Sequence, residues 1–191
     1  MTLFLCCHAS NIFLHASLQV YRMVKKELLV SPDLYDLEKP IAGIEEIEKY
    51  NPQRFEMEQL TAIVYENKDD VACVGYKDLT DGEFWVRGHI PGNPILPGVI
   101  ICEAAAQLAS YCSGKFAITE GVMMGFAGLD EVKFRGLIRP GDRLVIQAKM
   151  LKMRKFLITA QFMALVGDDI VAEGIVKGFP LTKELLEGSA R

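Results

Sequence analysis

From Gln59 onward the hydrophobic pattern changes to β-rich runs, which predict a β-hairpin. Two β-rich runs, Leu60 to Tyr65 and Val71 to Tyr76, flank the polar turn segment Asn67 to Asp70. A third short strand is expected at Phe84 to Val86. Upstream, isoleucines in the segment Ile41 to Tyr50 recur at helical spacing opposite glutamates, so we predict a short amphipathic helix that caps one edge of the core.

A long helix is expected in the middle of the chain. The segment Val99 to Ser113 is rich in alanine and has no helix breaker before Gly114, which predicts a helix that ends at a glycine cap. It is apolar on nearly every face, as a buried central helix is. The preceding segment, His89 to Gly98, contains three prolines that restrict its backbone, so we expect a stiff, extended loop.

The last third of the chain has the pattern of a meander of long strands. Turn sequences at Pro140 to Asp142 and Gly167 to Asp169 separate apolar runs that are typical of antiparallel hairpins. The expected strands cover roughly Val122 to Phe134, Arg143 to Leu151, Phe156 to Val166 and Ile170 to Phe179. One buried helix followed by such a meander favours an α+β fold in which an antiparallel sheet wraps the helix.

Composition and charge fit a folded domain with an extension. The 191 residues are 50% hydrophobic and 24% charged, with a net charge of -4, which excludes a disordered chain and disfavours nucleic-acid binding. The five cysteines and three histidines lack the paired spacing of metal ligands or of a disulfide framework. We therefore expect no metal site, and any catalysis must use ordinary side chains.

The ends of the chain are expected to lie outside the main domain. Residues 1–22 are apolar but interrupted by polar side chains, a pattern that fits neither a signal peptide nor a membrane-spanning helix well. We interpret them as an extension, and a cleaved or membrane-associating leader and a packed element remain as alternatives. Residues 23–58 would form an N-terminal segment, residues 59–180 the domain, and residues 181–191 a C-terminal tail.

Three groups near the loop and the helix are candidates for chemistry. Glu103 and Gln107 are the strongly polar residues of the apolar helix and lie on one face, and a carboxylate there is costly unless it is paired or used. His89 on the rigid loop would complete a histidine and carboxylate pair for acid–base chemistry. Gly98 offers a backbone N–H at the positive end of the helix, where a charged oxygen would be stabilised. The structural alternatives are a salt-bridged acid, a surface imidazole and a turn glycine.

A long motif around these residues resembles a known family. The run Gly88-His-Ile-Pro-Gly-Asn-Pro-Ile-Leu-Pro-Gly-Val-Ile-Ile-Cys-Glu-Ala-Ala-Ala-Gln107 resembles the signature of the FabZ-type 3-hydroxyacyl-acyl-carrier-protein dehydratases. Later segments resemble the same family in the same order: Phe126 to Phe134, Arg139 to Asp142 and Asp169 to Glu173. The resemblance implies a hot-dog fold, in which a curved antiparallel sheet wraps a long central helix.

The resemblance also implies roles for the three candidate groups. His89 and Glu103 match the catalytic residues, and the N–H of Gly98 matches the group that binds the thioester carbonyl. The implied reaction removes water from a 3-hydroxyacyl thioester to give the trans-2-enoyl product. Position 103 is typically Asp in the sister group that also isomerises the double bond, so the glutamate favours dehydration without isomerisation. Ile90 departs from the usual phenylalanine, which leaves the acyl chain length open.

The partners and the location follow from the same resemblance. The substrate is carried on the phosphopantetheine of an acyl carrier protein in the cytoplasm, with no further cofactor, no nucleic acid and no stable membrane insertion. Each site is shared between the two subunits of a homodimer, and three dimers can form a hexamer. Because the carrier is acidic, Lys133, Arg135 and Arg139 are expected to contact it, although a solvated strand face is the simpler explanation for any one of them.

Two other functions remain as alternatives. A hot-dog acyl thioesterase would activate water with a carboxylate and would not need His89 on its rigid loop. A non-catalytic hot-dog protein that binds the acyl carrier would use the N-terminal extension as its interaction element.

Overall fold

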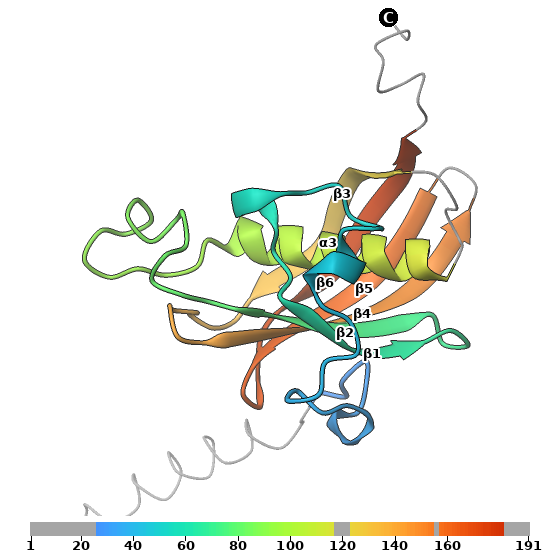
Figure 1. The fold of residues 1–191 in the computed structure, drawn as a ribbon, viewed down its shortest axis with the longest axis horizontal. Coiled ribbons are helices and arrows are strands. Elements are labelled where there is room, and N and C mark those ends of the chain that lie inside the picture. Colours follow the sequence, from blue (N-terminus) through green and yellow to red (C-terminus); the bar gives the residue numbers. More distant parts are fainter. Residues whose placement is uncertain (1–25, 117–122, 155–156, 182–191) are drawn as a thin grey trace, which may run out of the picture.

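A curved antiparallel sheet surrounds one long helix (Figure 1). The computed structural model describes residues 26–116, 123–154 and 157–181. Within these ranges the helix is α3 (Gly98–Lys115), and the sheet has six strands in the order β1-β2-β4-β5-β6-β3. The strands are β1 (Ala62–Asn67), β2 (Ala72–Asp78), β3 (Met123–Phe134), β4 (Arg143–Arg154), β5 (Leu157–Val166) and β6 (Asp169–Leu181). Strand β3 therefore forms one edge of the sheet.

The main core lies between α3 and the concave face of the sheet. Leu108 and Cys112 of α3 are fully buried in one cluster with Ile146 and Phe162 of the sheet. Gly75 of β2 permits this close approach, because a Cβ there would lie 3.2 Å from Cδ1 of Leu108 and 3.0 Å from a backbone oxygen. The alanine-rich sequence of α3 suits this position, since small side chains let the strands approach the helix axis.

The N-terminal segment packs on both layers. On the outer face of the sheet, Val30 belongs to a second buried cluster with Val74 and Leu165. Gln147 of β4, fully buried, holds Val30 in place: its Oε1 accepts the Val30 N–H at 3.1 Å, and its Nε2 donates to the Val30 carbonyl at 2.8 Å. The first helical element of this segment, η1 (Pro32–Leu34), follows Val30.

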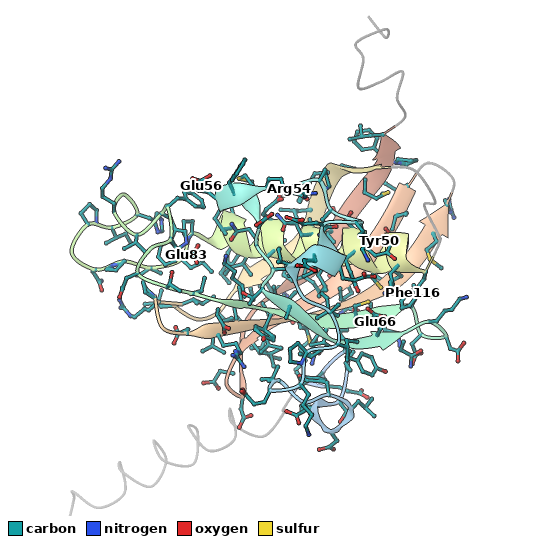
Figure 2. All side chains as sticks on the ribbon, in the orientation of Figure 1. Tyr50, Arg54, Glu56, Glu66, Glu83 and Phe116 are labelled. Atoms are coloured by element: carbon teal, nitrogen blue, oxygen red, sulfur yellow. The ribbon has the colours of Figure 1, made fainter. Side chains whose placement is uncertain are left out.

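Further along, the same segment runs beside α3. It contains α2 (Ile44–Ile47) and η2 (Phe55–Met57), which Figure 1 shows close to the helix. Tyr50 lies near Phe116 at the C-terminal end of α3, as Figure 2 shows, and its ring contacts Tyr111 edge to face at 5.3 Å. The segment thus covers the side of α3 that the strands leave open.

Most of the predicted elements are confirmed. The hairpin is β1 paired with β2, and the four strands of the last third are β3 to β6 within a few residues of their expected ends. The α+β class is confirmed as well. Predictions for residues 1–22 and for the tail beyond Leu181 lie outside the described residues. Within the described part, no helix is long and apolar enough to span a bilayer.

Three local predictions are wrong. The segment Phe84 to Val86 is not a strand but a series of turns, in which Val86 N–H bonds to the Glu83 carbonyl. The amphipathic helix expected over Ile41 to Tyr50 shortens to four residues, of which only Ile47 is buried. Gly114 does not cap α3, which continues to Lys115. Its lack of a side chain serves packing instead, since a Cβ there would lie 2.8 Å from the ring of Tyr50.

Candidate active site

The carboxyl group of Glu103 lies at the centre of a hydrogen-bonded amide cluster. Glu103 is partly buried on α3, and its Oε1 accepts a hydrogen bond from Gln107 Nε2 at 2.8 Å. A second amide, Nε2 of Gln53, donates to the same oxygen at 3.4 Å. The prediction that Glu103 and Gln107 share a face is confirmed. Both donors bond to Oε1, so the two amides together fix the orientation of the carboxyl group.

Gln107 also connects α3 to the N-terminal segment. Its side chain, 2% exposed, accepts the Gln59 N–H at 2.9 Å through Oε1 and donates to the Met57 carbonyl at 2.7 Å. The amide of Asn51 donates to the Gln107 carbonyl at 3.0 Å. Sequence reasoning missed the contribution of residues 51–59 to the site. The only signal there is a group of polar side chains around Pro52, which is equally typical of a loop.

A cavity that is open to solvent lies beside Glu103, with about 530 Å³ of empty space when its open part is included. It lies between α3 and the strands β3, β5 and β6, and its wall is mostly apolar. The residues that line it are Gln53, Glu103, Ala106, Ala109, Ser110, Ser113, Met124, Gly125, Phe126, Ile158, Ala160, Val176, Lys177 and Gly178. From Glu103 to Ser113 the cavity follows α3 for about 15 Å at the rise of an α-helix. Such a space accommodates an extended, flexible apolar group with its polar end near the carboxyl.

The ring of His89 is oriented by the loop that carries it. Its Nδ1 lies 2.7 Å from the Ile95 carbonyl oxygen, which can only accept, so Nδ1 is the donor in this hydrogen bond and Nε2 is the ring nitrogen that takes no part in it. The His89 N–H bonds to the Trp85 carbonyl at 2.7 Å. Arg139 fixes the far side of the loop, where it donates to Asn93 Oδ1 at 2.6 Å. The imidazole is exposed, and Figure 1 shows the loop projecting beyond the N-terminal end of α3.

The loop contains an energetically unfavourable backbone conformation next to His89. Ile90 has a φ of 62°, in the left-handed region that β-branched residues rarely adopt. Gly92, at φ 82°, meets the same demand without a steric penalty. Strain at a position like Ile90 persists where the surrounding hydrogen bonds enforce it, and it is found most often at functional sites.

Gly98 begins α3, as predicted, and has little room for a side chain. Its Cβ, if present, would lie 2.8 Å from Cζ of Phe134 at the end of β3. The N–H groups of the first helical turn have no partner within the helix and lie at its positive end. The glycine therefore lets the ring of Phe134 pack against the start of α3, next to these N–H groups.

The structure does not join His89 to Glu103 within one chain. Among the described residues no hydrogen bond links them, and His89 is absent from the lining of the cavity beside Glu103. One subunit thus presents a carboxyl with a cavity and, separately, an exposed base on a projecting loop.

Comparisons with known proteins agree with this geometry. The sequence profile of the FabA-like domain family matches residues 51–175. The chain is 35% identical over 127 residues to the 3-hydroxyacyl-[acyl-carrier-protein] dehydratase FabZ of Caldanaerobacter subterraneus. This alignment covers 66% of this chain and 89% of the relative. It is 34% identical over 132 residues to the enzyme of the same name from Clostridioides difficile, with 69% and 92% covered. The chain belongs to the FabZ-type dehydratase family.

The fold agrees with that of a solved structure. The dehydratase heterocomplex ApeI:P from Xenorhabdus doucetiae aligns with a TM-score of 0.64 over 76% of this chain and 97% of that one, at 16% identity. The expected hot-dog fold, with its long helix inside a curved sheet, is thereby confirmed.

Within this family member, two of the three expected carrier contacts already have partners. All three side chains are exposed, but Arg135 donates to Glu173 at 2.5 Å and Arg139 donates to Asn93 in the histidine loop. Glu173 is 5% exposed and also accepts a hydrogen bond from Lys26. The hydrogen bond from Lys26, and to a smaller extent the one from Arg135, hold the pKa of Glu173 below its ordinary value of 4.5. Among the described residues, no group of three or more His, Cys, Asp and Glu side chains could hold a metal ion.

Proposed function

We propose that this protein dehydrates 3-hydroxyacyl-acyl-carrier-protein thioesters to trans-2-enoyl thioesters in fatty acid biosynthesis. The observation that carries the proposal is the carboxyl of Glu103, oriented by two amides at one end of an apolar cavity, in a chain of the FabZ-type family. This arrangement suits a reaction at the polar end of an acyl chain. There the carboxyl group can protonate a leaving hydroxyl group.

The residues divide the chemistry into three tasks. Nε2 of His89 removes a proton from C2 of the substrate, and the electrons of that bond form the C2=C3 double bond. The bond from C3 to the hydroxyl oxygen breaks, and Glu103 donates the proton that converts the hydroxide into water. The N–H of Gly98 binds the thioester carbonyl oxygen, on which negative charge develops as the proton leaves. Proton exchange with solvent then restores both side chains.

The active site is shared between the two subunits of a homodimer. The exposed imidazole of His89 has no place in the cavity of its own chain, so it is free to reach the cavity of a partner. The edge strand β3 supports such a dimer, because it is long and carries the exposed apolar side chains of Phe126 and Leu129. Three such dimers would form the hexamer expected from the family. A monomer would be inactive.

The acyl chain lies in the cavity along α3, and the acyl carrier protein docks at its mouth. All three side chains are exposed, but Arg135 and Arg139 bond to Glu173 and Asn93, whereas Lys133 makes no hydrogen bond or ion pair with a described residue and is the better candidate for a carrier contact. The phosphopantetheine arm brings the thioester to Gly98, and the protein itself supplies no further cofactor. We place the reaction in the cytoplasm.

Enoyl absorbance tests this function directly. The full-length protein is given a 3-hydroxyacyl carrier thioester, and product formation is compared with that of His89→Ala and Glu103→Gln. We expect turnover by the wild type and a fall of about 100-fold or more in each variant. Release of free thiol without enoyl product would indicate a thioesterase, and binding without either product would indicate a carrier-binding protein. Equal rates in the variants would contradict the residue assignment.

A further inference from the structure

One hydrogen-bond acceptor in the wall of the cavity has no partner. Nε2 of Gln53 donates a hydrogen bond to Glu103, but Oε1 of Gln53 is buried and makes no hydrogen bond with any described residue. The same side chain lines the cavity beside Glu103. A buried amide oxygen without a partner costs about 1–3 kcal/mol, so such atoms in folded proteins are usually satisfied by a ligand, an ion or water.

Hydrogen bonds to the backbone around Gln53 hold this residue in position. Arg54, visible in Figure 2 beside α3, donates to the carbonyls of Gln53 at 2.6 Å and of Asn51 at 2.8 Å. Asn51 in turn donates to the Gln107 carbonyl on α3. After Gln53, Gln107 of α3 donates to the Met57 carbonyl. The segment is therefore tied to α3 on both sides of Gln53, and the amide of Gln53 is oriented before any ligand arrives.

The chemistry of the substrate limits what can satisfy this oxygen. An amide oxygen only accepts hydrogen bonds, so its partner must be a donor. In the acyl part of a 3-hydroxyacyl thioester, the carbonyl oxygen and the sulfur are not donors, and the only O–H belongs to the 3-hydroxyl group. The same hydroxyl must lie next to Glu103, which protonates its oxygen. The enoyl product has no such donor, whereas the released water does.

We propose that Gln53 is a specificity residue, whose Oε1 accepts a hydrogen bond from the 3-hydroxyl group of the substrate. This inference rests on the proposed dehydratase function. The O–H hydrogen points to Gln53, and a lone pair on the hydroxyl oxygen then faces Glu103. Gln53 thus distinguishes the hydroxyacyl substrate from the saturated acyl chain of the same length and orients the leaving group.

Binding without turnover tests the proposal. In a His89→Ala background, affinities are measured by calorimetry for the pantetheine thioester of a 3-hydroxyacyl chain and for its saturated counterpart. We expect the hydroxy form to bind about 3- to 10-fold more tightly, as one neutral hydrogen bond allows. Adding Gln53→Met, which keeps the length and removes the amide, should reduce this ratio to about one. Glu56→Gln is the control, because Glu56 is exposed in the same segment and should leave the ratio unchanged.

Turnover separates this proposal from the proposed function. In the otherwise wild-type protein, Gln53→Met should lower kcat/KM by about tenfold, and Gln53→Asn, which withdraws the amide by one carbon, should do the same without exposing apolar surface. Absence of enoyl product from the wild type would refute the dehydratase function itself. If the wild type dehydrates and a folded Gln53→Met or Gln53→Asn variant keeps the preference for the hydroxy form, the role of Gln53 is refuted and the function stands.

Discussion

Two buried glutamines hold the N-terminal segment, one on each side of the sheet, and they offer a matched pair of perturbations. Gln147 holds both backbone groups of Val30 on the outer face, and Gln107 holds Gln59 and Glu103 on the inner one. Each can be replaced by leucine, which has a similar size and no polar atoms. We predict that the two substitutions separate stability from catalysis.

The magnitudes follow from which groups lose their partners. Gln147→Leu leaves the N–H and the carbonyl of Val30 buried and unpaired, at about 1–3 kcal/mol each, so the free energy of unfolding falls by about 2–6 kcal/mol. Gln107→Leu leaves the buried Gln59 N–H unpaired and costs about 1–3 kcal/mol, since the carbonyl of Met57 belongs to an exposed residue and can bond to water.

Catalysis should follow the opposite order. Gln107→Leu removes the 2.8 Å hydrogen bond that orients Glu103 and should lower kcat/KM by about tenfold or more. Gln147→Leu touches no group in the cavity and should change kcat/KM by less than about twofold. Stability is measured by urea unfolding at one protein concentration, with circular dichroism and the fluorescence of the buried Trp85 as probes. If Gln107→Leu left kcat/KM unchanged, or if Gln147→Leu were the more harmful to catalysis, the reasoning would be refuted.

Three further changes test other parts of the structure. Gly98→Ala places a methyl group 2.8 Å from Phe134 and should affect kcat/KM more strongly than the free energy of unfolding. Turnover and urea unfolding are measured on the same variant. An unchanged kcat/KM would show that Gly98 is not part of the site. Glu173 has a lowered pKa in the folded state, so its stabilising effect is present above pH 4.5 and is lost as the pH falls through the folded-state pKa. The loss of unfolding free energy in Glu173→Gln should therefore shrink between pH 7 and pH 3, and a constant difference would contradict this. Ser110→Leu fills the cavity about 10 Å along α3 from Glu103 and should reduce kcat/KM for long acyl chains while sparing four-carbon ones, whereas equal effects on both would place the chain elsewhere.

The fold could be predicted from sequence wherever the pattern reflects local burial. The apolar runs of the last third and the alanine-rich run of α3 each report a buried segment, and strands and a helix lie where these runs predict them. Gly114 is not the predicted helix cap. A glycine is needed there because the ring of Tyr50, a residue distant in sequence, packs against that position. Phe84 to Val86 has the composition of a strand, but its backbone bonds within the loop: the Val86 N–H donates to the Glu83 carbonyl, and the Trp85 carbonyl accepts the N–H groups of Gly88 and His89.

The site was predictable to a smaller extent. Glu103 and Gln107 stand out because polar residues are rare on an apolar helix, and their spacing predicts a shared face, on which the structure shows a hydrogen bond between them. Gln53 could not be found in this way, since its role depends on Asn51 holding a loop against α3 and on Arg54 bonding to the carbonyls within that loop. The strand order, which places β2 beside β4 and β3 at the edge, also depends on long-range packing that sequence periodicity does not carry.

The central claim is that His89 of one subunit and Glu103 of another form one dehydrating site. The most direct measurement mixes His89→Ala with Glu103→Gln after subunit exchange, which is verified by mass spectrometry of differently labelled chains, and follows enoyl formation. A heterodimer contains one site with both substitutions and one with neither, so random exchange should restore about a quarter of the wild-type activity. Mixtures that exchange fully and stay as inactive as the separate variants would contradict the shared site.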